Sequence, residues 1–207
     1  MNVIFNLPSI PKYAARFEML KSLAGKLDSL SVVTNEGLGS YPSMPDNMSV
    51  LCLPRKKLQF LGETLSTLSY KRADIVHDTF GYFMPLGALT KLGRRQKYVT
   101  SVYGSAIGWL RRAREIKYGN MEEIRAQRLL KAREFVNSRL ADSVLVNSES
   151  FSRDYRDCYG CQADKIRVIP NCVLVEKDAI YREKSKSGVD ILYVGRLSEM
   201  KGIHLLL

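Results

Sequence analysis

Short apolar runs alternate along the chain with longer segments in which apolar residues recur every three or four positions. The short runs are typical of strands buried on both faces, and the longer segments are typical of amphipathic helices. Repeated strand–helix–strand units predict an α/β fold, a Rossmann-like, doubly wound parallel sheet. The predicted strands are 2–7, 30–34, 49–53, 73–78, 97–102, 143–146 and 165–169. The predicted helices are 13–27, 56–70, 83–92, a basic region broken near 119–120 whose second piece is 122–140, and 150–158.

The pattern changes after the seventh strand. Residues 176–189 are polar and charged, and one more apolar run follows at 191–194. We therefore expect one complete domain over 1–175, a linker over 176–189, and the first strand and helix start of a truncated second domain over 190–207. A strand and a helical turn are too short to be stable alone or to form a pocket.

Composition narrows the class of protein. The chain is 45% hydrophobic and 26% charged, as is ordinary for a globular protein. No apolar run approaches the roughly 20 residues that span a bilayer, and the first residues lack the basic segment of a signal peptide. We therefore expect a cytoplasmic protein. Its net charge of +11 predicts an anionic partner, such as nucleotide phosphates, an acidic membrane surface or nucleic acid.

The positive charge is concentrated in the predicted helices between 111 and 139. Two interpretations remain open: a solvated helical face, or contact with an anionic membrane surface, where each nearby cation contributes about 1 kcal/mol. Nucleic acid is disfavoured as a partner, because no interleaved aromatics or known nucleic-acid module are present. The spacing of the second helix predicts a buried stripe of Leu129, Ala132, Val136 and Leu140.

The cysteines raise the question of a metal or redox site, because Cys158 and Cys161 form a C-x-x-C pair. Zinc would need four good ligands, and only Cys172, a distant Cys52 and two histidines are available beside this pair. A redox C-x-x-C normally opens a helix, whereas this one is predicted to close one. We expect ordinary thiols, no metal and no cofactor.

Ligands of an open parallel sheet bind beyond the carboxyl ends of its strands. A carboxylate there, Asp78, is suited to hold an acceptor hydroxyl, although a structural role fits the sequence equally well. His77 has no visible acidic partner besides Asp78, which favours a hydrogen-bonded position in the sheet over a catalytic base. The polar positions that follow the strands are Asn6, Ser9, His77, Asp78, Tyr103, Gly104, Ser105, Asn147, Ser148 and Asn171. The candidate substrate-binding residues among them are Ser9, His77, Asp78, Tyr103, Gly104, Ser148 and Asn171.

The last apolar run has its own candidate site. Gly195 lets a ligand approach the backbone, and Arg196 and Lys201 flank the turn into a predicted helix. Free N–H groups at a helix N-terminus and fixed cations attract the same kind of ligand, an anion. The sequence therefore predicts a phosphate site at these residues.

Residues 194–202, Val-Gly-Arg-Leu-Ser-Glu-Met-Lys-Gly, resemble the segment that opens the donor domain of GT-B glycosyltransferases of the family-4 type. Segments 73–77, 141–149 and 165–171 resemble three acceptor-domain segments of that family, in the same order. The resemblance implies that Gly195, Arg196 and Lys201 bind the diphosphate of a nucleotide sugar. It also implies a retaining hexosyltransferase that needs no metal and acts on a glycan or lipid-linked acceptor.

The chain departs from the family pattern at three places. Pro8-Ser9-Ile10-Pro11 stands where a Gly-Gly loop is usual, Tyr103 where a histidine is usual, and Cys172 where a glycine is usual. The paired glutamates of the family fall in a part of the donor domain that this sequence does not contain. No catalytic residue is therefore assigned.

Two functional interpretations follow. The first is a nucleotide-sugar-dependent glycosyltransferase, incomplete as this chain and peripheral on the inner face of a membrane. The second is a non-catalytic binding module with a basic, membrane-facing surface. It would be either a truncated product or half of a split enzyme whose partner chain supplies the donor domain.

Overall fold

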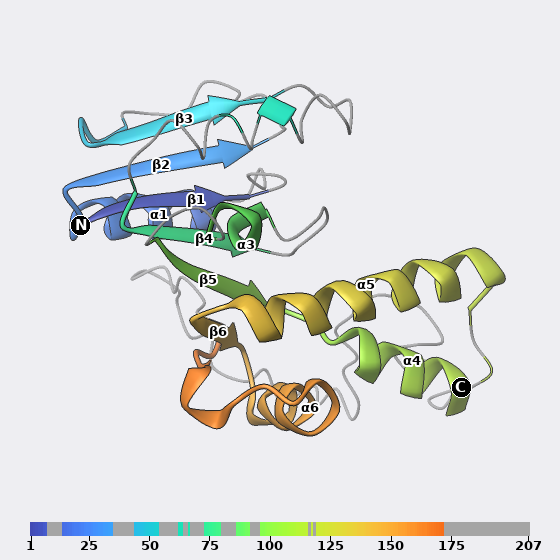
Figure 1. The fold of residues 1–207 in the computed structure, drawn as a ribbon. Helices are drawn as coiled ribbons and strands as arrows, with labels where there is room; N and C mark the ends of the chain where they lie inside the picture. Colours follow the sequence, from blue (N-terminus) through green and yellow to red (C-terminus); the bar gives the residue numbers. More distant parts are fainter. Residues whose placement is uncertain are drawn as a thin grey trace, which may run out of the picture.

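The computed structural model describes residues 1–7, 14–34, 44–53, 62–63, 66, 73–79, 86–91, 96–115, 117 and 119–171. Its strands form one sheet in the order β3-β2-β1-β4-β5-β6-β7, and all neighbours are parallel (Figure 1). The strands are β1 (Asn2–Asn6), β2 (Ser29–Thr34), β3 (Met48–Cys52), β4 (Ile75–Thr79), β5 (Lys97–Val102), β6 (Ser143–Val146) and β7 (Ile166–Val168). The helices are α1 (Ala14–Ala24), α3 (Leu86–Lys91), α4 (Ala106–Glu115), α5 (Met121–Leu140) and α6 (Glu149–Tyr159), with a 3-10 turn η1 (Ala163–Lys165). This architecture confirms the predicted Rossmann-like fold.

Each face of the sheet carries its own hydrophobic core, because side chains alternate between the two faces along every strand. On one face α1 buries Leu20 against a cluster that includes Phe5 of β1. On the other face Ala88 of α3 and Tyr155 of α6 pack in a cluster with Tyr98 of β5. Figure 1 shows α1 and α3 on opposite sides of the strands. The sheet is therefore covered on both faces, as its apolar strands require.

The predicted elements agree closely with the observed ones in the described part of the chain. Every predicted strand is present within two residues of its expected bounds, and the break between α4 and α5 lies at the expected place. Most of the predicted helix 56–70 lies outside the described residues, as do 176–189 and 190–207. No helix in the described part is both long and apolar enough to cross a bilayer.

The predicted buried stripe of α5 is wrong. The side chains of Leu129 and Val136 are 67% and 38% exposed, Ala132 is also exposed, and Leu140 is only half-buried. The buried residues of α5 are instead polar, and the carboxylate of Glu134 accepts hydrogen bonds from Ala106 and Tyr159 of the neighbouring helices. These buried residues are Glu134, Asn137 and Ser138.

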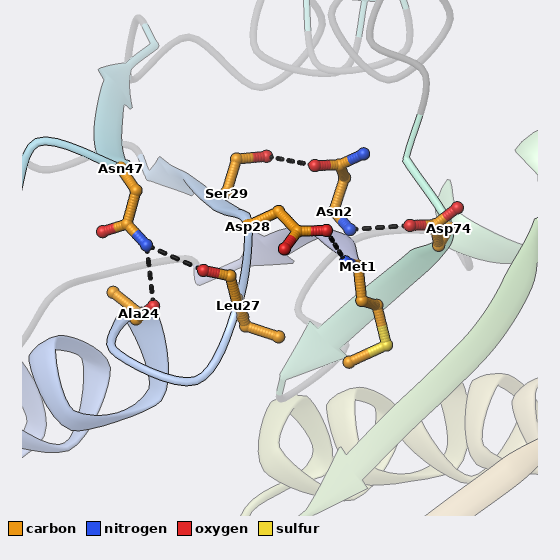
Figure 2. A network of polar contacts seen from close by, with 8 residues as sticks. All are labelled: Met1, Asn2, Ala24, Leu27, Asp28, Ser29, Asn47 and Asp74. Carbon is orange, nitrogen blue, oxygen red and sulfur yellow. Dashed lines mark hydrogen bonds and ion pairs between the residues drawn. The ribbon is translucent and has the colours of Figure 1, made fainter.

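The amino edge of the sheet is closed by side chains that bond to backbone groups (Figure 2). The Asn47 side-chain amide donates to the carbonyl oxygens of Ala24 and Leu27, at 2.8 and 2.9 Å, just after α1. The backbone N–H of Asn2 donates to the carboxylate of Asp74 at 2.7 Å, which ties β1 to the start of β4. These contacts leave the carboxyl edge as the side of the sheet that remains for a ligand. The network also includes Met1, Asp28 and Ser29.

Candidate functional site

The strand order reverses direction between β1 and β4, which are neighbours although β2 and β3 separate them in the sequence. At such a switch point the connections leave the sheet in opposite directions, and a crevice opens at the carboxyl ends of the two strands. Asn6 and Asp78 are register partners at this place. The side-chain amide of Asn6 donates to Oδ1 of Asp78 at 3.3 Å. The switch point is therefore marked by a polar pair.

Asp78 is a buried carboxylate, with only 4% of its surface exposed. Its second oxygen, Oδ2, accepts a 2.9 Å hydrogen bond from the backbone N–H of Gly87 at the start of α3. Burial raises the pKa of Asp78 to about 6, although the hydrogen bonds from Gly87 and Asn6 act in the opposite direction. A carboxyl group with such a pKa exchanges its proton close to neutral pH, which suits a group that binds or activates a hydroxyl.

Gly87 allows the close approach between α3 and this carboxylate. A Cβ atom at position 87 would lie 2.4 Å from the ring of Tyr98 and 3.0 Å from Oδ2 of Asp78. No larger side chain fits without displacing the aromatic ring. The glycine in the sequence Leu-Gly-Ala therefore lets the start of α3 pack close enough to hydrogen-bond with Asp78.

His77 does not join Asp78, because consecutive residues of a strand face opposite sides of the sheet. Nε2 of His77 lies 2.6 Å from Oγ of Ser101, and its ring packs edge-on against Phe5 at 4.3 Å between centroids. Burial lowers the pKa of His77 to about 4, so the ring is neutral at pH 7. This agrees with the interpretation of His77 as a hydrogen-bonded residue of the sheet.

The remaining candidates lie at the ends of the next strands. The carbonyl oxygen of Tyr103 accepts from the side-chain amide of Asn147 at 3.5 Å, which brings the ends of β5 and β6 together. Gly104 borders open space, since a Cβ there would meet nothing within 4 Å. Oγ of Ser148 accepts from the N–H of Phe151 at 3.3 Å and caps α6, which is a structural role. The structure does not describe Ser9, Gly195, Arg196 or Lys201.

Asn171 is the last described residue, and its side chain is exposed beyond β7, the edge strand of the sheet. The strands β5 and β6 separate β7 from β4, so Asn171 does not meet the Asn6–Asp78 pair. The structure therefore brings Asp78 and its neighbours together and leaves Asn171 apart.

Sequence reasoning missed a second buried carboxylate, Glu134 of α5. Its oxygens accept from the backbone N–H of Ala106 at 3.1 and 3.2 Å, and the hydroxyl of Tyr159 donates to Oε2. Burial raises the pKa of Glu134 to about 6. The carboxylate thus fixes the N-terminus of α4 to both α5 and α6. No local signal marks it, because its partners are 25 and 28 positions away.

Two hollows adjoin these helices. A cavity of about 20 Å³ beside Gly104 and Glu134 has room for one water molecule and is too small for a substrate. A groove of about 600 Å³ lies between α4 and α5, beyond the carboxyl end of β5. Its lining residues are Leu110, Arg111, Ala113, Arg114, Lys117, Gly119, Ile124, Arg128 and Lys131.

The C-x-x-C pair closes α6, as expected. Cys158 lies in the last turn, and Gly160 adopts a left-handed conformation (φ 63°) at the C-cap before Cys161. Cys161 is buried, and burial raises the pKa of its thiol, which opposes formation of a reactive thiolate. Among the described residues, no group of His, Cys, Asp and Glu side chains is arranged to hold a metal ion.

The sequence pattern of Glycosyltransferase Family 4 matches residues 18–177, most of the chain and nearly all of the sheet. The chain belongs to glycosyltransferase family 4. The inferred resemblance to this family is thereby confirmed, and the match includes segments 73–77, 141–149 and 165–171 but not 194–202. No curated protein sequence matches the chain.

Solved structures of GT-B glycosyltransferases share the fold of this family-4 domain. HepE of Anabaena, in complex with UDP-glucose, is 14% identical with a TM-score of 0.53, over 83% of this chain and 44% of HepE. Sucrose-phosphate synthase of Thermosynechococcus elongatus is 13% identical with a TM-score of 0.56, over 82% and 47% of the two chains. Os79 of O. sativa, in complex with UDP, is 11% identical with a TM-score of 0.52, over 82% and 51%.

These similarities show the fold alone, because the identities are low. The chain spans about half the length of the structures that it matches. Its seven-stranded sheet corresponds to the N-terminal domain of a GT-B glycosyltransferase.

Proposed function

We propose that this chain is the acceptor-binding part of an enzyme that transfers a hexose from a nucleotide sugar to a glycan or lipid-linked acceptor. The observation that carries the proposal is the Asn6–Asp78 pair at the topological switch point of a family-4 domain. Ligands of open α/β sheets bind at this place, and a buried carboxylate with a pKa near 6 suits the binding of a hydroxyl.

In this proposal the acceptor hydroxyl binds at Asp78, whose carboxylate is oriented by Asn6 and by the N–H of Gly87. The nucleotide sugar binds with its diphosphate at Gly195, Arg196 and Lys201. These two cations stabilise the charge that develops as the diphosphate leaves, so that no metal is needed. The sugar is transferred with retention of its configuration, as the family resemblance implies. The bound UDP and UDP-glucose of Os79 and HepE support a uridine diphosphate sugar as the donor class.

The donor half of the proposal is tested by ligand-observed NMR with UDP and the 207-residue chain. Saturation transfer to UDP should be strongly reduced in Arg196→Gln/Lys201→Gln. The matched control is Lys26→Gln/Lys97→Gln, which removes the same charge from exposed positions at the amino edge of the sheet. Equal transfer in both double variants would count against the proposed role of Arg196 and Lys201.

A second candidate function is a non-catalytic module that docks on an anionic membrane, on its own or with a partner chain that supplies the donor domain. One specific observation favours a membrane contact: Met121, Leu129 and Val136 are exposed at helical spacing along α5. Arg125 and Arg139 lie on the same side of the helix. Exposed apolar side chains among arginines fit the boundary between headgroups and acyl chains.

Sedimentation with vesicles tests this contact. The chain should sediment with vesicles that contain phosphatidylglycerol and stay in solution with phosphatidylcholine alone. Leu129→Asp/Val136→Asp should abolish sedimentation, whereas Met44→Asp/Leu51→Asp, at exposed apolar positions elsewhere, should not. A membrane-bound chain that gives no turnover when a donor domain is supplied would favour the module over the enzyme.

A further inference from the structure

The groove between α4 and α5 combines an apolar floor with cationic walls. Ala113 is buried, Leu110 and Ile124 are half-buried, and these three side chains form the floor. Arginine and lysine side chains from both helices form the walls, and all of them are exposed. The wall residues are Arg111, Arg114, Lys117, Arg128 and Lys131.

Most of this charge is uncompensated. Arg111 forms an ion pair with Asp154 at 3.4 Å. The side chains of Arg114, Lys117, Arg128 and Lys131 make no ion pair or hydrogen bond with any residue that the structure describes, and no acidic residue lines the groove. Four like charges around one hollow repel one another in the empty protein, and an anion placed among them relieves this repulsion.

Two described residues between the helices, Lys117 and Gly119, line the end of the groove and have positive φ angles. Lys117 adopts a left-handed conformation with φ 50°, which is rare for a residue with a side chain. Gly119 has φ 101°, and a Cβ there would lie 3.0 Å from the ring of Trp109. Residues with such a backbone conformation are frequent at ligand-binding positions. Here the conformation of Lys117 fixes the direction in which its side chain leaves the backbone.

We propose that the α4–α5 groove binds the diphosphate group of a diphosphate-linked acceptor. The diphosphate bridge of such an acceptor carries one negative charge on each of its two phosphoryl groups, so it can contact cations on both walls of the groove, whereas a monophosphate places its charge at one point. The groove volume of about 600 Å³ lies within the range of small-ligand sites, and its apolar floor leaves room for the group that the diphosphate carries.

The position of the groove fits an acceptor rather than a donor. At 1.5 Å per helical residue, Leu110 and Arg114 lie about 6 and 12 Å beyond the start of α4 at the carboxyl end of β5. Figure 1 shows α4 and α5 projecting past the ends of the strands. A diphosphate held there leaves the sugar end of the same molecule free to reach the switch point at Asp78. This acceptor role rests on the proposed function, whereas the anion site itself does not.

The chain contains a built-in reporter for this site. Trp109 is its only tryptophan, is half-buried on α4, and its ring lies 3.0 Å from where a Cβ at position 119, a groove residue, would stand. A fluorescence titration of the 207-residue chain with inorganic pyrophosphate should therefore change the Trp109 emission in a saturable way. Inorganic phosphate should bind more weakly, because it neutralises fewer of the cations.

Substitutions of the groove cations test whether pyrophosphate binds in the α4–α5 groove. Arg114→Gln/Lys131→Gln should raise the apparent Kd for pyrophosphate at least about tenfold, because each cation removed costs a charge-assisted contact. The control Lys26→Gln/Lys97→Gln removes the same net charge at the opposite edge of the sheet and should leave the Kd unchanged. Equal weakening in both variants would show nonspecific attraction and would overturn the site. Circular dichroism confirms that each variant is folded.

Three further measurements distinguish a lipid-linked diphosphate from a nucleotide diphosphate, and the groove site from the donor site of the proposed function. Farnesyl diphosphate that binds more tightly than pyrophosphate supports a lipid-linked acceptor, and UDP that binds in the groove more tightly than either would overturn the acceptor role. If pyrophosphate binding survives in Arg114→Gln/Lys131→Gln but is lost in Arg196→Gln/Lys201→Gln, the groove site is overturned while the proposed function stands. The reverse pattern, in which only Arg114→Gln/Lys131→Gln loses pyrophosphate binding, supports the groove.

Discussion

Asn6 and Asp78 lie at the carboxyl ends of two neighbouring strands, 72 positions apart in the sequence, and their side chains meet at 3.3 Å. The contact crosses the place where the strand order reverses, which is where a parallel sheet opens toward a ligand. The same carboxylate also accepts a hydrogen bond from the backbone N–H of Gly87, so residues from β1, β4 and α3 meet at Asp78. Asp78 is therefore both a junction of the fold and the central residue of the candidate site.

The stability of the protein should depend on the ionisation of Asp78. Its folded-state pKa is raised to about 6, so between pH 4 and 6 the folded protein holds the proton more tightly than the unfolded chain does. The contribution of Asp78 to stability is thus present at low pH and is lost as pH rises through 6. The free energy of unfolding of Asp78→Asn, taken relative to that of the unmodified chain at the same pH, should rise by about 1 kcal/mol between pH 5 and pH 7. Urea unfolding at the two pH values measures this.

The matched control for this measurement is Asp46→Asn, which changes an exposed carboxylate. His77 acts in the opposite direction in the unmodified chain, because its lowered pKa of about 4 removes stability as pH falls below 6.5. The comparison of each variant with the unmodified chain at the same pH cancels this contribution. An identical pH trend in Asp78→Asn and Asp46→Asn would contradict the prediction.

Gly87 should tolerate no side chain. In Gly87→Ala the new methyl group would lie 2.4 Å from the Tyr98 ring, so that the ring or α3 must move. We expect a loss of about 2–3 kcal/mol in the free energy of unfolding, measured by urea denaturation. Gly104→Ala is the control, because a Cβ at that position meets nothing within 4 Å, and its effect should stay within about 0.5 kcal/mol. Equal effects of the two substitutions would contradict the packing around Asp78.

Two neighbouring tyrosines of α6 should respond differently to loss of the hydroxyl group. The hydroxyl of Tyr159 donates to the buried carboxylate of Glu134, so Tyr159→Phe should cost about 1–3 kcal/mol of stability. The hydroxyl of Tyr155 has no hydrogen-bond partner among the residues that the structure describes, and Tyr155→Phe should change stability little. Thermal unfolding at pH 7 measures both. A larger loss in Tyr155→Phe than in Tyr159→Phe would refute this account of Glu134.

The strands were predictable from the sequence because burial on both faces leaves a continuous apolar run that does not depend on the partner strands. The buried face of α5 was not predictable in this way. Leu129 and Val136 recur at helical spacing, and so do Glu134, Asn137 and Ser138 on the buried side. Periodicity locates two faces of a helix, and only tertiary contacts decide which one is buried.

The candidate site was predictable to the same limited degree. The rule that ligands bind beyond strand ends gave both Asn6 and Asp78 from the sequence, but it did not show that the two side chains are partners, and it did not give the role of Gly87. These depend on which strands become neighbours, and that order is a property of the whole sheet. Ser148 was selected by the same rule, yet its hydroxyl caps α6, because a strand-to-helix junction needs a cap whether or not a ligand binds.

The 207-residue chain by itself should turn over little or no sugar nucleotide. A nucleotide sugar in a GT-B enzyme lies between two domains, and this chain spans 44% of the length of HepE. Residues 190–207 supply the predicted cations Arg196 and Lys201, but the strand and helix start predicted there are too short to enclose a nucleotide. A coupled assay for released UDP, with UDP-glucose and a range of glycan acceptors, measures this directly. Addition of a family-4 donor domain as a separate chain should raise the rate if the sheet binds the acceptor as proposed. Robust turnover by the isolated chain would show that these residues form a complete donor site.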